Sequence, residues 1–205
     1  MTQETLRLLI AEDVELVAEA FEALLSTEPA FEVVARVGRG DHVLAAVEKY
    51  RPDIALLDVD MPGATGIEAT RLVTAQFPDC KVILLTALPG SGHLHQALAA
   101  GTSGYLVKAT TGARLIDAVK TVAVGGTVID PQLAADALRS GPNPLSEREQ
   151  EILRYVDQGL NTRTIAAKLF LSHGTVRNYL SSTMTKLDAS SRVEAVRTAR
   201  HRGWF

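Results

Sequence analysis

Hydrophobic residues in the first 124 positions gather in short runs, separated by longer stretches with helical spacing. Several runs are apolar at consecutive positions, which is typical of strands buried on both faces of a parallel sheet. Strands are predicted at residues 6–11, 31–37, 53–59, 81–87 and 104–108. Helices are predicted at residues 15–27, 41–50, 66–76, 91–100 and 112–124. The alternation predicts an α/β domain over residues 1–124 with a five-stranded, parallel, doubly wound sheet.

The pattern changes beyond the predicted sheet. Glycines, prolines and one short helical stretch at residues 131–139 predict a linker over residues 125–143. No strand pattern follows the linker. Ser146 and Glu149 have the spacing of a capping box, which opens the first of four predicted helices. A very short turn joins the second helix to the third, and this predicts an all-α helix-turn-helix domain over residues 144–205.

The formal net charge of −3 hides an asymmetry between the two parts of the 205-residue chain. Residues 1–143 hold 11 Lys and Arg against 18 Asp and Glu, a net charge of −7. Residues 144–205 hold 10 against 6, a net charge of +4. A charge of +4 is also common on solvated helical surfaces, but the contrast makes the basic part a candidate for binding a polyanion.

Composition excludes several other classes of protein. No apolar run approaches the roughly 18 residues that span a bilayer, and the acidic start lacks a signal-peptide pattern. We therefore expect a cytoplasmic protein with no membrane partner. The single cysteine, Cys80, rules out an internal disulfide, and no Cys/His cluster has the spacing of a zinc site.

Polar side chains gather where the predicted strands end, at Glu12, Asp13, Asp58, Asp60, Thr86 and Lys108. Because the carboxyl ends of parallel strands share one edge of the sheet, these groups should face one crevice. Any one of them alone would more often be a solvated surface group, but grouped acids predict a hard divalent cation, Mg²⁺. The set suits phosphoryl transfer, with Asp58, at the end of the most apolar run, as the predicted nucleophile.

These residues lie in motifs of a known family. The segments AED (11–13), LLDVDMPGATG (56–66), LLTA (84–87) and GYLVKA (104–109) resemble the flavodoxin-like receiver domain of two-component response regulators. The segments LSEREQEILRYVDQGLNTRTIAAKL (145–169) and GTVRNYLSSTMTKLDASSRVEAV (174–196) resemble the helix-turn-helix of the NarL/FixJ class, also called LuxR-type. Within that class, TVRNY and the terminal RGWF are most similar to the DesR-like regulators.

The resemblance implies a phosphorylation switch without a metabolic reaction. Asp58 would accept a phosphoryl group from a sensor histidine kinase, and the receiver would assist its own phosphorylation and dephosphorylation. Mg²⁺ would be held by Glu12, Asp13, Asp58 and the backbone carbonyl of Asp60. Thr86 and Lys108 would bind the phosphoryl oxygens, and Thr86 and Tyr105 would form the switch. Phosphorylation would promote homodimerisation and binding to double-stranded promoter DNA, and RNA polymerase is a further candidate partner.

The third helix of the tail is the predicted recognition helix. Val176, Leu180, Met184 and Leu187 should face the core, which leaves a donor-rich outer face without an acid. Because arginine and asparagine can pair with base edges, we expect base contacts from Arg177, Asn178 and Ser181. Phosphate contacts are expected from Thr175, Tyr179, Ser182 and Lys186. For this helix alone, a solvated polar face would be the more common interpretation.

Two other functions remain as alternatives. A constitutive DNA-binding protein could use the first domain only as a dimerisation scaffold, but a scaffold does not need the complete set of acids, hydroxyl and lysine. An enzyme of flavodoxin-like architecture acting on a small molecule is the second. The chain lacks both G-x-G-x-x-G after the first strand and G-x-x-x-x-G-K-[ST], the usual phosphate cradles.

Overall fold

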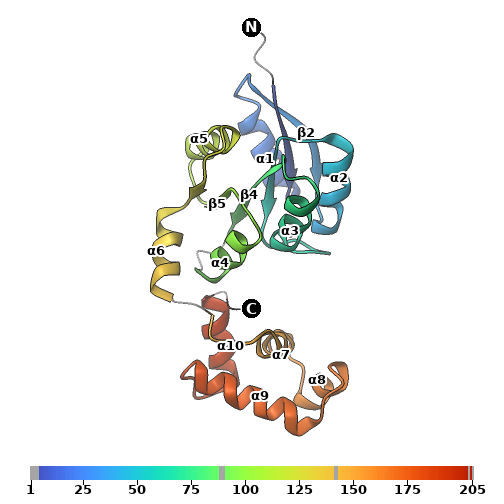
Figure 1. Cartoon of the computed structure of the whole chain (residues 1–205), viewed down its shortest axis with the longest axis vertical. Coiled ribbons are helices and arrows are strands. Elements are labelled where there is room, and N and C mark those ends of the chain that lie inside the picture. The colour runs from blue at the N-terminus through green and yellow to red at the C-terminus, as the bar shows by residue number, and fades with distance from the viewer. Residues whose placement is uncertain (1–4, 88–90, 141–142, 203, 205) are drawn as a thin grey trace. The chain divides into compact units, whose positions relative to one another are not determined.

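A parallel sheet with helices on both faces makes up the first of two units into which the chain divides (Figure 1). The structure is a computed structural model that describes residues 5–87, 91–140, 143–202 and 204. The first unit comprises residues 1–89 and 94–134, and the second comprises residues 90–93 and 135–205. The strands are β1 (Leu6–Ala11), β2 (Phe31–Val37), β3 (Ile54–Asp58), β4 (Lys81–Thr86), β5 (Gly104–Val107) and β6 (Val128–Ile129). The helices that lie wholly or mostly in this unit are α1 (Glu15–Leu25), the 3-10 turn η1 (Gly40–His42), α2 (Val43–Tyr50), α3 (Gly66–Gln76), α4 (Ser91–Ala99) and α5 (Gly112–Ala123).

The six strands are all parallel and lie in the order β2-β1-β3-β4-β5-β6. The predicted parallel, doubly wound architecture is confirmed, but the predicted number of five strands is one too low. The added strand β6 lies in the segment predicted as a linker, where it pairs with β5 through Gly104↔Val128 and Tyr105↔Ile129. Two residues between glycines and a proline are too short to give a period, so the pattern concealed this strand.

Alternate residues of the central strands point to opposite faces, and both faces are buried. On one face Leu8, Leu56 and Leu85 pack with residues of α1 and α5, among them Leu115 and Val119. The other face carries a second set of buried residues, Leu9, Ala55, Leu57, Leu84 and Tyr105. Each fully buried large apolar side chain contributes roughly 2 kcal/mol, so the sheet edge that carries the polar groups rests on a rigid base.

The second unit is helical, and α6 (Pro131–Ser140) crosses the boundary between the two units. The remaining helices are α7 (Glu147–Asp157), α8 (Thr162–Lys168), α9 (His173–Lys186) and α10 (Arg192–His201). Ser146 and Glu149 form the predicted capping box of α7, and Asn161 caps α8. A core that includes Ile152, Ile165 and Val176 joins the helices.

The buried residues of the second unit include Trp204 of the terminal RGWF motif, whose Gly203 and Phe205 lie outside the described residues. Among the described helices, none is both long and apolar enough to cross a membrane.

Candidate functional site

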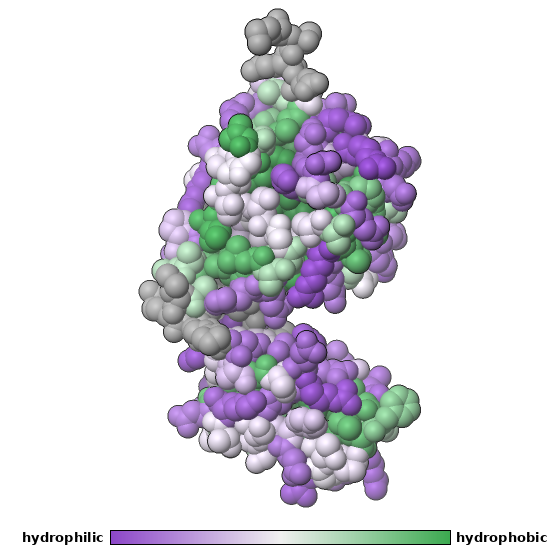
Figure 2. Space-filling view, in the orientation of Figure 1, coloured by the Kyte–Doolittle hydropathy of each residue, from purple (hydrophilic) through white to green (hydrophobic). Residues whose placement is uncertain are grey.

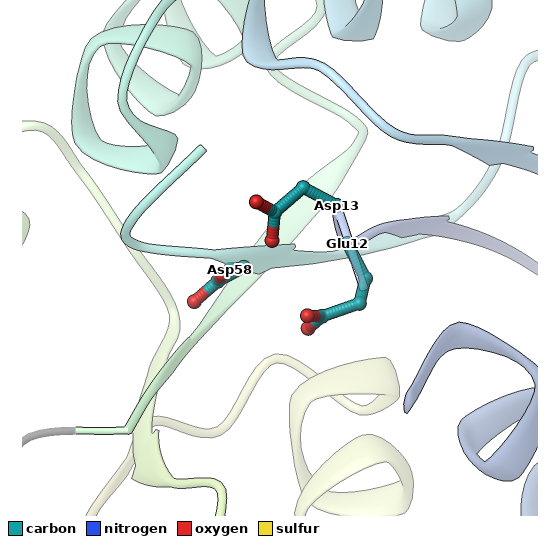
Figure 3. A group of neighbouring side chains, drawn as sticks. All are labelled: Glu12, Asp13 and Asp58. Carbon is teal, nitrogen blue, oxygen red and sulfur yellow. The ribbon is translucent and has the colours of Figure 1, made fainter. Parts of the chain in front are cut away.

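Three carboxylates meet at the carboxyl ends of β1 and β3 (Figure 3). Glu12, Asp13 and Asp58 each offer an oxygen, and these oxygens lie within 4.8 Å of one another. Glu12 and Asp58 are buried, whereas Asp13 is exposed. Asp60 is exposed, and the role of its backbone carbonyl as a ligand stays a prediction. The buried parallel strands thus bring Asp58 together with acids that are 45 and 46 positions away in the chain.

Lys108, which follows β5, is the cation of this cluster. Its Nζ lies 2.6 Å from Glu12 Oε2 and 3.0 Å from Asp58 Oδ2. Burial raises the pKa of Asp58, and the nearby lysine only partly offsets this effect. Burial lowers the pKa of Lys108, but the two carboxylates outweigh burial and raise it above its usual value. Lys108 is therefore held in its charged form between the two acids.

The cluster fits a hard divalent cation. Among the described residues, Asp58 Oδ1 is buried and has no hydrogen-bond partner. A buried carboxylate oxygen without a donor is costly, and a cation bound by oxygen ligands would satisfy it. Glu12 and Asp13 each supply a further oxygen, and the oxygens of the three acids lie within 4.8 Å of one another.

The loop after Asp58 returns close to the strand because Gly66 has no side chain. The Gly66 amide donates to Val59 O over 2.9 Å, and a Cβ at Gly66 would lie only 2.1 Å from Asp58 O. Thr65 and Glu68 then form a capping box that starts α3. No role was predicted for Gly66, although a glycine at the first position of a helix is a signal of close backbone approach.

Thr86 and Tyr105, the predicted switch pair, are both fully buried on the neighbouring strands β4 and β5. The Lys108 amide donates to Thr86 O over 2.7 Å, which connects the ends of these strands. Burial raises the pKa of the Tyr105 hydroxyl well above its usual value, while the nearby Thr86 side chain opposes this shift. The ring of Tyr105 is thus a buried group on the sheet that carries the phosphoacceptor candidate.

The outer face of α9, opposite its buried apolar residues, is polar, as predicted. Arg177, Asn178 and Ser181 are exposed, whereas Val176 and Leu180 are buried in the helical core. On the side seen in Figure 2, the surface of the second unit is largely hydrophilic, with an apolar patch at one edge. The three side chains predicted to contact base edges are therefore accessible.

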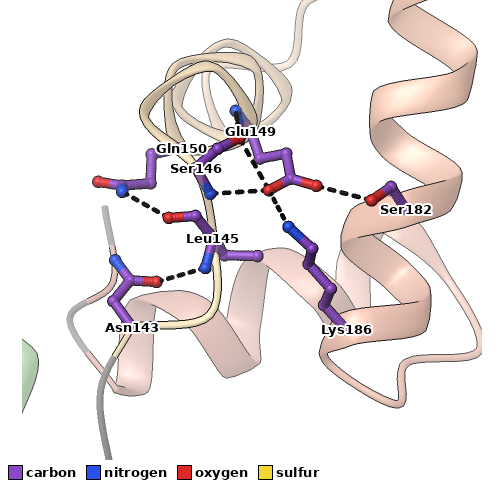
Figure 4. Close-up of polar contacts among 7 residues, drawn as sticks. All are labelled: Asn143, Leu145, Ser146, Glu149, Gln150, Ser182 and Lys186. Carbon is purple, nitrogen blue, oxygen red and sulfur yellow. Dashed lines mark hydrogen bonds and ion pairs between the residues drawn. The ribbon is translucent and has the colours of Figure 1, made fainter.

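The other four predicted DNA contacts already interact with neighbouring groups of the second unit. Tyr179 is half-buried and packs against the helical core, and the Thr175 hydroxyl shares a 2.8 Å hydrogen bond with Ser172. Ser182 and Lys186 both bind an acidic side chain of another helix, α7 (Figure 4). Ser182 Oγ donates to Glu149 Oε1 over 2.7 Å, and Lys186 Nζ lies 2.7 Å from Glu149 Oε2.

Glu149 was predicted only as a capping residue. It also accepts from the amide and hydroxyl of Ser146, over 2.7 and 2.9 Å. Burial by itself would raise the pKa of Glu149, but hydrogen bonds from Lys186, Ser146 and Ser182 outweigh it and lower the pKa to about 2. The partners on α9 are 33 and 37 positions away, so no local pattern could have revealed them.

A doubly wound receiver-like sheet with an acidic cluster and a lysine at its carboxyl edge, joined to a helix-turn-helix unit, defines the response regulator class. Residues 8–120 match the response regulator receiver domain, and residues 143–199 match the bacterial regulatory proteins of the luxR family. The chain belongs to the LuxR-type (NarL) family of two-component response regulators. It is accordingly a regulator of transcription rather than a metabolic enzyme.

Relatives match along nearly the whole chain. The transcriptional regulatory protein DesR of Bacillus subtilis is 38% identical over 196 residues, covering 96% of this chain and 97% of DesR. The transcriptional activator DevR/DosR of Mycobacterium tuberculosis is 33% identical, covering 92% and 91% of the two chains.

Two solved structures have a similar fold. The response regulator ChrA of a heme-sensing two-component system has a TM-score of 0.59 and 31% identity, covering 98% of this chain and all of ChrA. RcsB in complex with DNA has a TM-score of 0.68 at 22% identity, covering 96% and 98% of the two chains, and shows a shared fold.

Proposed function

We propose that phosphorylation of Asp58 by a sensor histidine kinase promotes homodimerisation of this regulator and its binding to specific promoter DNA. In this proposal residues 1–124 are the receiver, residues 125–143 the linker and residues 144–205 the DNA-binding domain. The single observation that carries it is the buried Asp58 carboxylate, 3.0 Å from Lys108 and grouped with Glu12 and Asp13.

The reaction transfers a phosphoryl group from a phosphohistidine, which is a phosphoramidate, to the Asp58 carboxylate, which becomes an acyl phosphate. An oxygen of Asp58 attacks the phosphorus of a phosphohistidine. The P–O bond forms as the P–N bond breaks, and the imidazole leaves with the electron pair and takes up a proton. Lys108 and Thr86 bind the phosphoryl oxygens, and Lys108 neutralises part of their charge. Attack by water on phosphorus later restores the carboxylate and releases inorganic phosphate.

Glu12, Asp13, Asp58 and the carbonyl of Asp60 would hold Mg²⁺. When bound, Mg²⁺ would neutralise charge on the phosphoryl oxygens during the transfer. The acids are supported in this role by the common location of their oxygens, and Asp58 Oδ1 by its lack of a donor among the described residues.

The output is a change at the sheet that reaches the second unit. A phosphoryl group adds roughly −1.5 to −2 charge and three acceptor oxygens, which favours movement of the Thr86 hydroxyl toward it and repacking of Tyr105. Dimerisation then pairs two recognition helices. Arg177, Asn178 and Ser181, exposed on α9, are the proposed base contacts. Thr175 and Tyr179 remain proposed phosphate contacts, and RNA polymerase remains a candidate partner.

The test compares the full chain with Asp58→Ala, each with and without a small phosphodonor and Mg²⁺. Molecular mass is measured by light scattering. DNA duplexes are selected from a random pool by the donor-treated wild type, and their affinities are compared at one fixed salt concentration, because phosphate contacts make affinity salt-dependent. Asp79→Ala, which removes an exposed loop acid, is the matched control.

The donor should dimerise the wild type and Asp79→Ala and tighten their DNA binding by at least tenfold, while Asp58→Ala stays unchanged. If all three proteins dimerise and bind DNA equally well without the donor, the receiver is a constitutive scaffold and the proposed switch is wrong.

A further inference from the structure

An ionic junction connects the start of α7 to the recognition helix α9 (Figure 4). Glu149 lies at its centre, with a side chain only 3% exposed. One carboxylate oxygen accepts from Ser182 over 2.7 Å, and the other lies 2.7 Å from Lys186 Nζ and also accepts from Ser146. Both oxygens are therefore engaged, and two of the donors come from one helix.

The chain that leads into α7 is fixed at the same place. Asn143 Oδ1 accepts from the Leu145 amide over 2.9 Å, and Asn143 Nδ2 donates to Trp204 O over 2.9 Å. Gln150 Nε2 donates to Leu145 O over 3.0 Å. Asn143, Leu145 and Gln150 thus hold the segment that leads directly into Ser146, and Ser146 and α9 both bind Glu149.

The burial of Glu149 favours an ion pair of Lys186 with Glu149 over a contact of Lys186 with a DNA phosphate. Removing one partner from a buried ion pair leaves an uncompensated charge, which is far more costly than losing a pair at the surface. Lys186 is 38% exposed, so water would weaken its attraction to a DNA phosphate. Moving Lys186 to that phosphate would also leave the Glu149 carboxylate, which is 3% exposed, without a counter-charge. The ion pair with Glu149 is therefore favoured even when DNA lies beside α9.

We propose that Glu149 is a positioning residue for DNA recognition, which holds Ser182 and Lys186 away from the phosphate backbone and uses them to fix α9 for base readout. This inference rests on the proposed DNA-contact face of α9. It replaces the expectation that Ser182 and Lys186 contact phosphates with a role inside the protein. Arg177, Asn178 and Ser181, which are exposed, stay on the DNA side.

The test measures how affinity depends on salt. The donor-treated full chain, Lys186→Met, Glu149→Gln and the double variant are titrated with the selected duplex and with a mixed-sequence duplex of equal length. Each phosphate contact contributes about 0.9 to the slope of log affinity against log salt. Lys186→Met should keep the wild-type slope, because this lysine does not contact phosphate.

Glu149→Gln should release Lys186 to the backbone. Its slope should steepen by about 0.9, and its affinity for the mixed-sequence duplex should rise by up to roughly eightfold near 0.1 M salt. Discrimination between the two duplexes should fall at the same time, because α9 has lost its anchor. Adding Lys186→Met should return the slope to the wild-type value. A merely structural role for Glu149 would weaken binding to both duplexes without steepening the slope.

Three measurements keep the outcomes separate. A slope that falls by about 0.9 in Lys186→Met means that the lysine already contacts phosphate, and this overturns the proposal. Fluorescence of Trp204, the only tryptophan, reports whether each variant folds. If either single variant does not fold, the slope of the double variant, which leaves no unpaired charge, decides: a wild-type slope supports the proposal and a slope lower by about 0.9 overturns it. Arg177→Ala is the control that must lower discrimination. A wild type that does not prefer the selected duplex refutes the proposed function itself.

Discussion

Replacing Lys108 with methionine should destabilise the receiver in a pH-dependent way. The substitution keeps a side chain of similar length but removes the only cation that the structure places within 4 Å of Glu12 and Asp58 among the described residues. Their side chains are 1% and 5% exposed, and that of Lys108 is 17% exposed. Two carboxylates would then share a buried site without a counter-charge.

The magnitude follows from this burial. Breaking a buried ion pair by removing one partner costs about 3–5 kcal/mol. The lower end applies here, because exposed Asp13 marks a side of the cluster that water can reach. The expected loss is therefore about 3 kcal/mol near neutral pH. It should shrink as pH falls, because burial has raised the pKa of Asp58 and protonation of this carboxylate removes one of the unpaired charges.

The assay is urea unfolding followed by circular dichroism without divalent cations, at several values between neutral pH and about pH 4. Lys120→Met is the matched control, since Lys120 forms a 2.8 Å ion pair with Glu28 in which both side chains are at least 30% exposed. The control should lose less than about 1 kcal/mol. Millimolar Mg²⁺ should restore part of the loss in Lys108→Met. An unchanged midpoint at neutral pH, or an equal loss at every pH, would refute the reasoning.

Three further outcomes are expected. Asp58→Asn should stabilise the receiver at neutral pH without Mg²⁺, because burial raises the pKa of Asp58 and its charge therefore opposes folding; urea unfolding should show the gain disappearing toward pH 4. Gly66→Ala should cost about 2 kcal/mol and slow phosphorylation by a small donor, whereas Gly38→Ala, whose Cβ would meet nothing closer than 3.7 Å, should change neither. The pKa of Glu149 is lowered to about 2, so its ionised carboxylate should add about 3 kcal/mol to the free energy of unfolding above its ordinary pKa of 4.5, and this contribution should be lost as pH falls through 2. Unfolding followed by Trp204 fluorescence should show that Glu149→Gln lacks this pH-dependent loss.

The receiver site could be predicted because its residues occupy positions that topology makes equivalent. Glu12 and Lys108 directly follow β1 and β5, Asp58 is the last residue of β3, and parallel strands end at one edge of the sheet. Their positions at strand ends were therefore enough to predict that these residues lie close together. Gly66 was missed because its importance comes from the space around Asp58 O, which no periodicity records.

The helical unit shows where that kind of inference stops. The periodicity of α9 predicted a buried side with Val176 and an outer side with Ser182 and Lys186. Val176 is indeed buried, and Ser182 and Lys186 are indeed exposed. Exposure does not say what a polar side chain binds, however. Glu149 reaches α9 from a different helix, and its identity as a capping residue gave a complete local reason for its presence. A polar outer face therefore cannot be equated with a DNA-contact face until the acids that reach it from neighbouring helices are known.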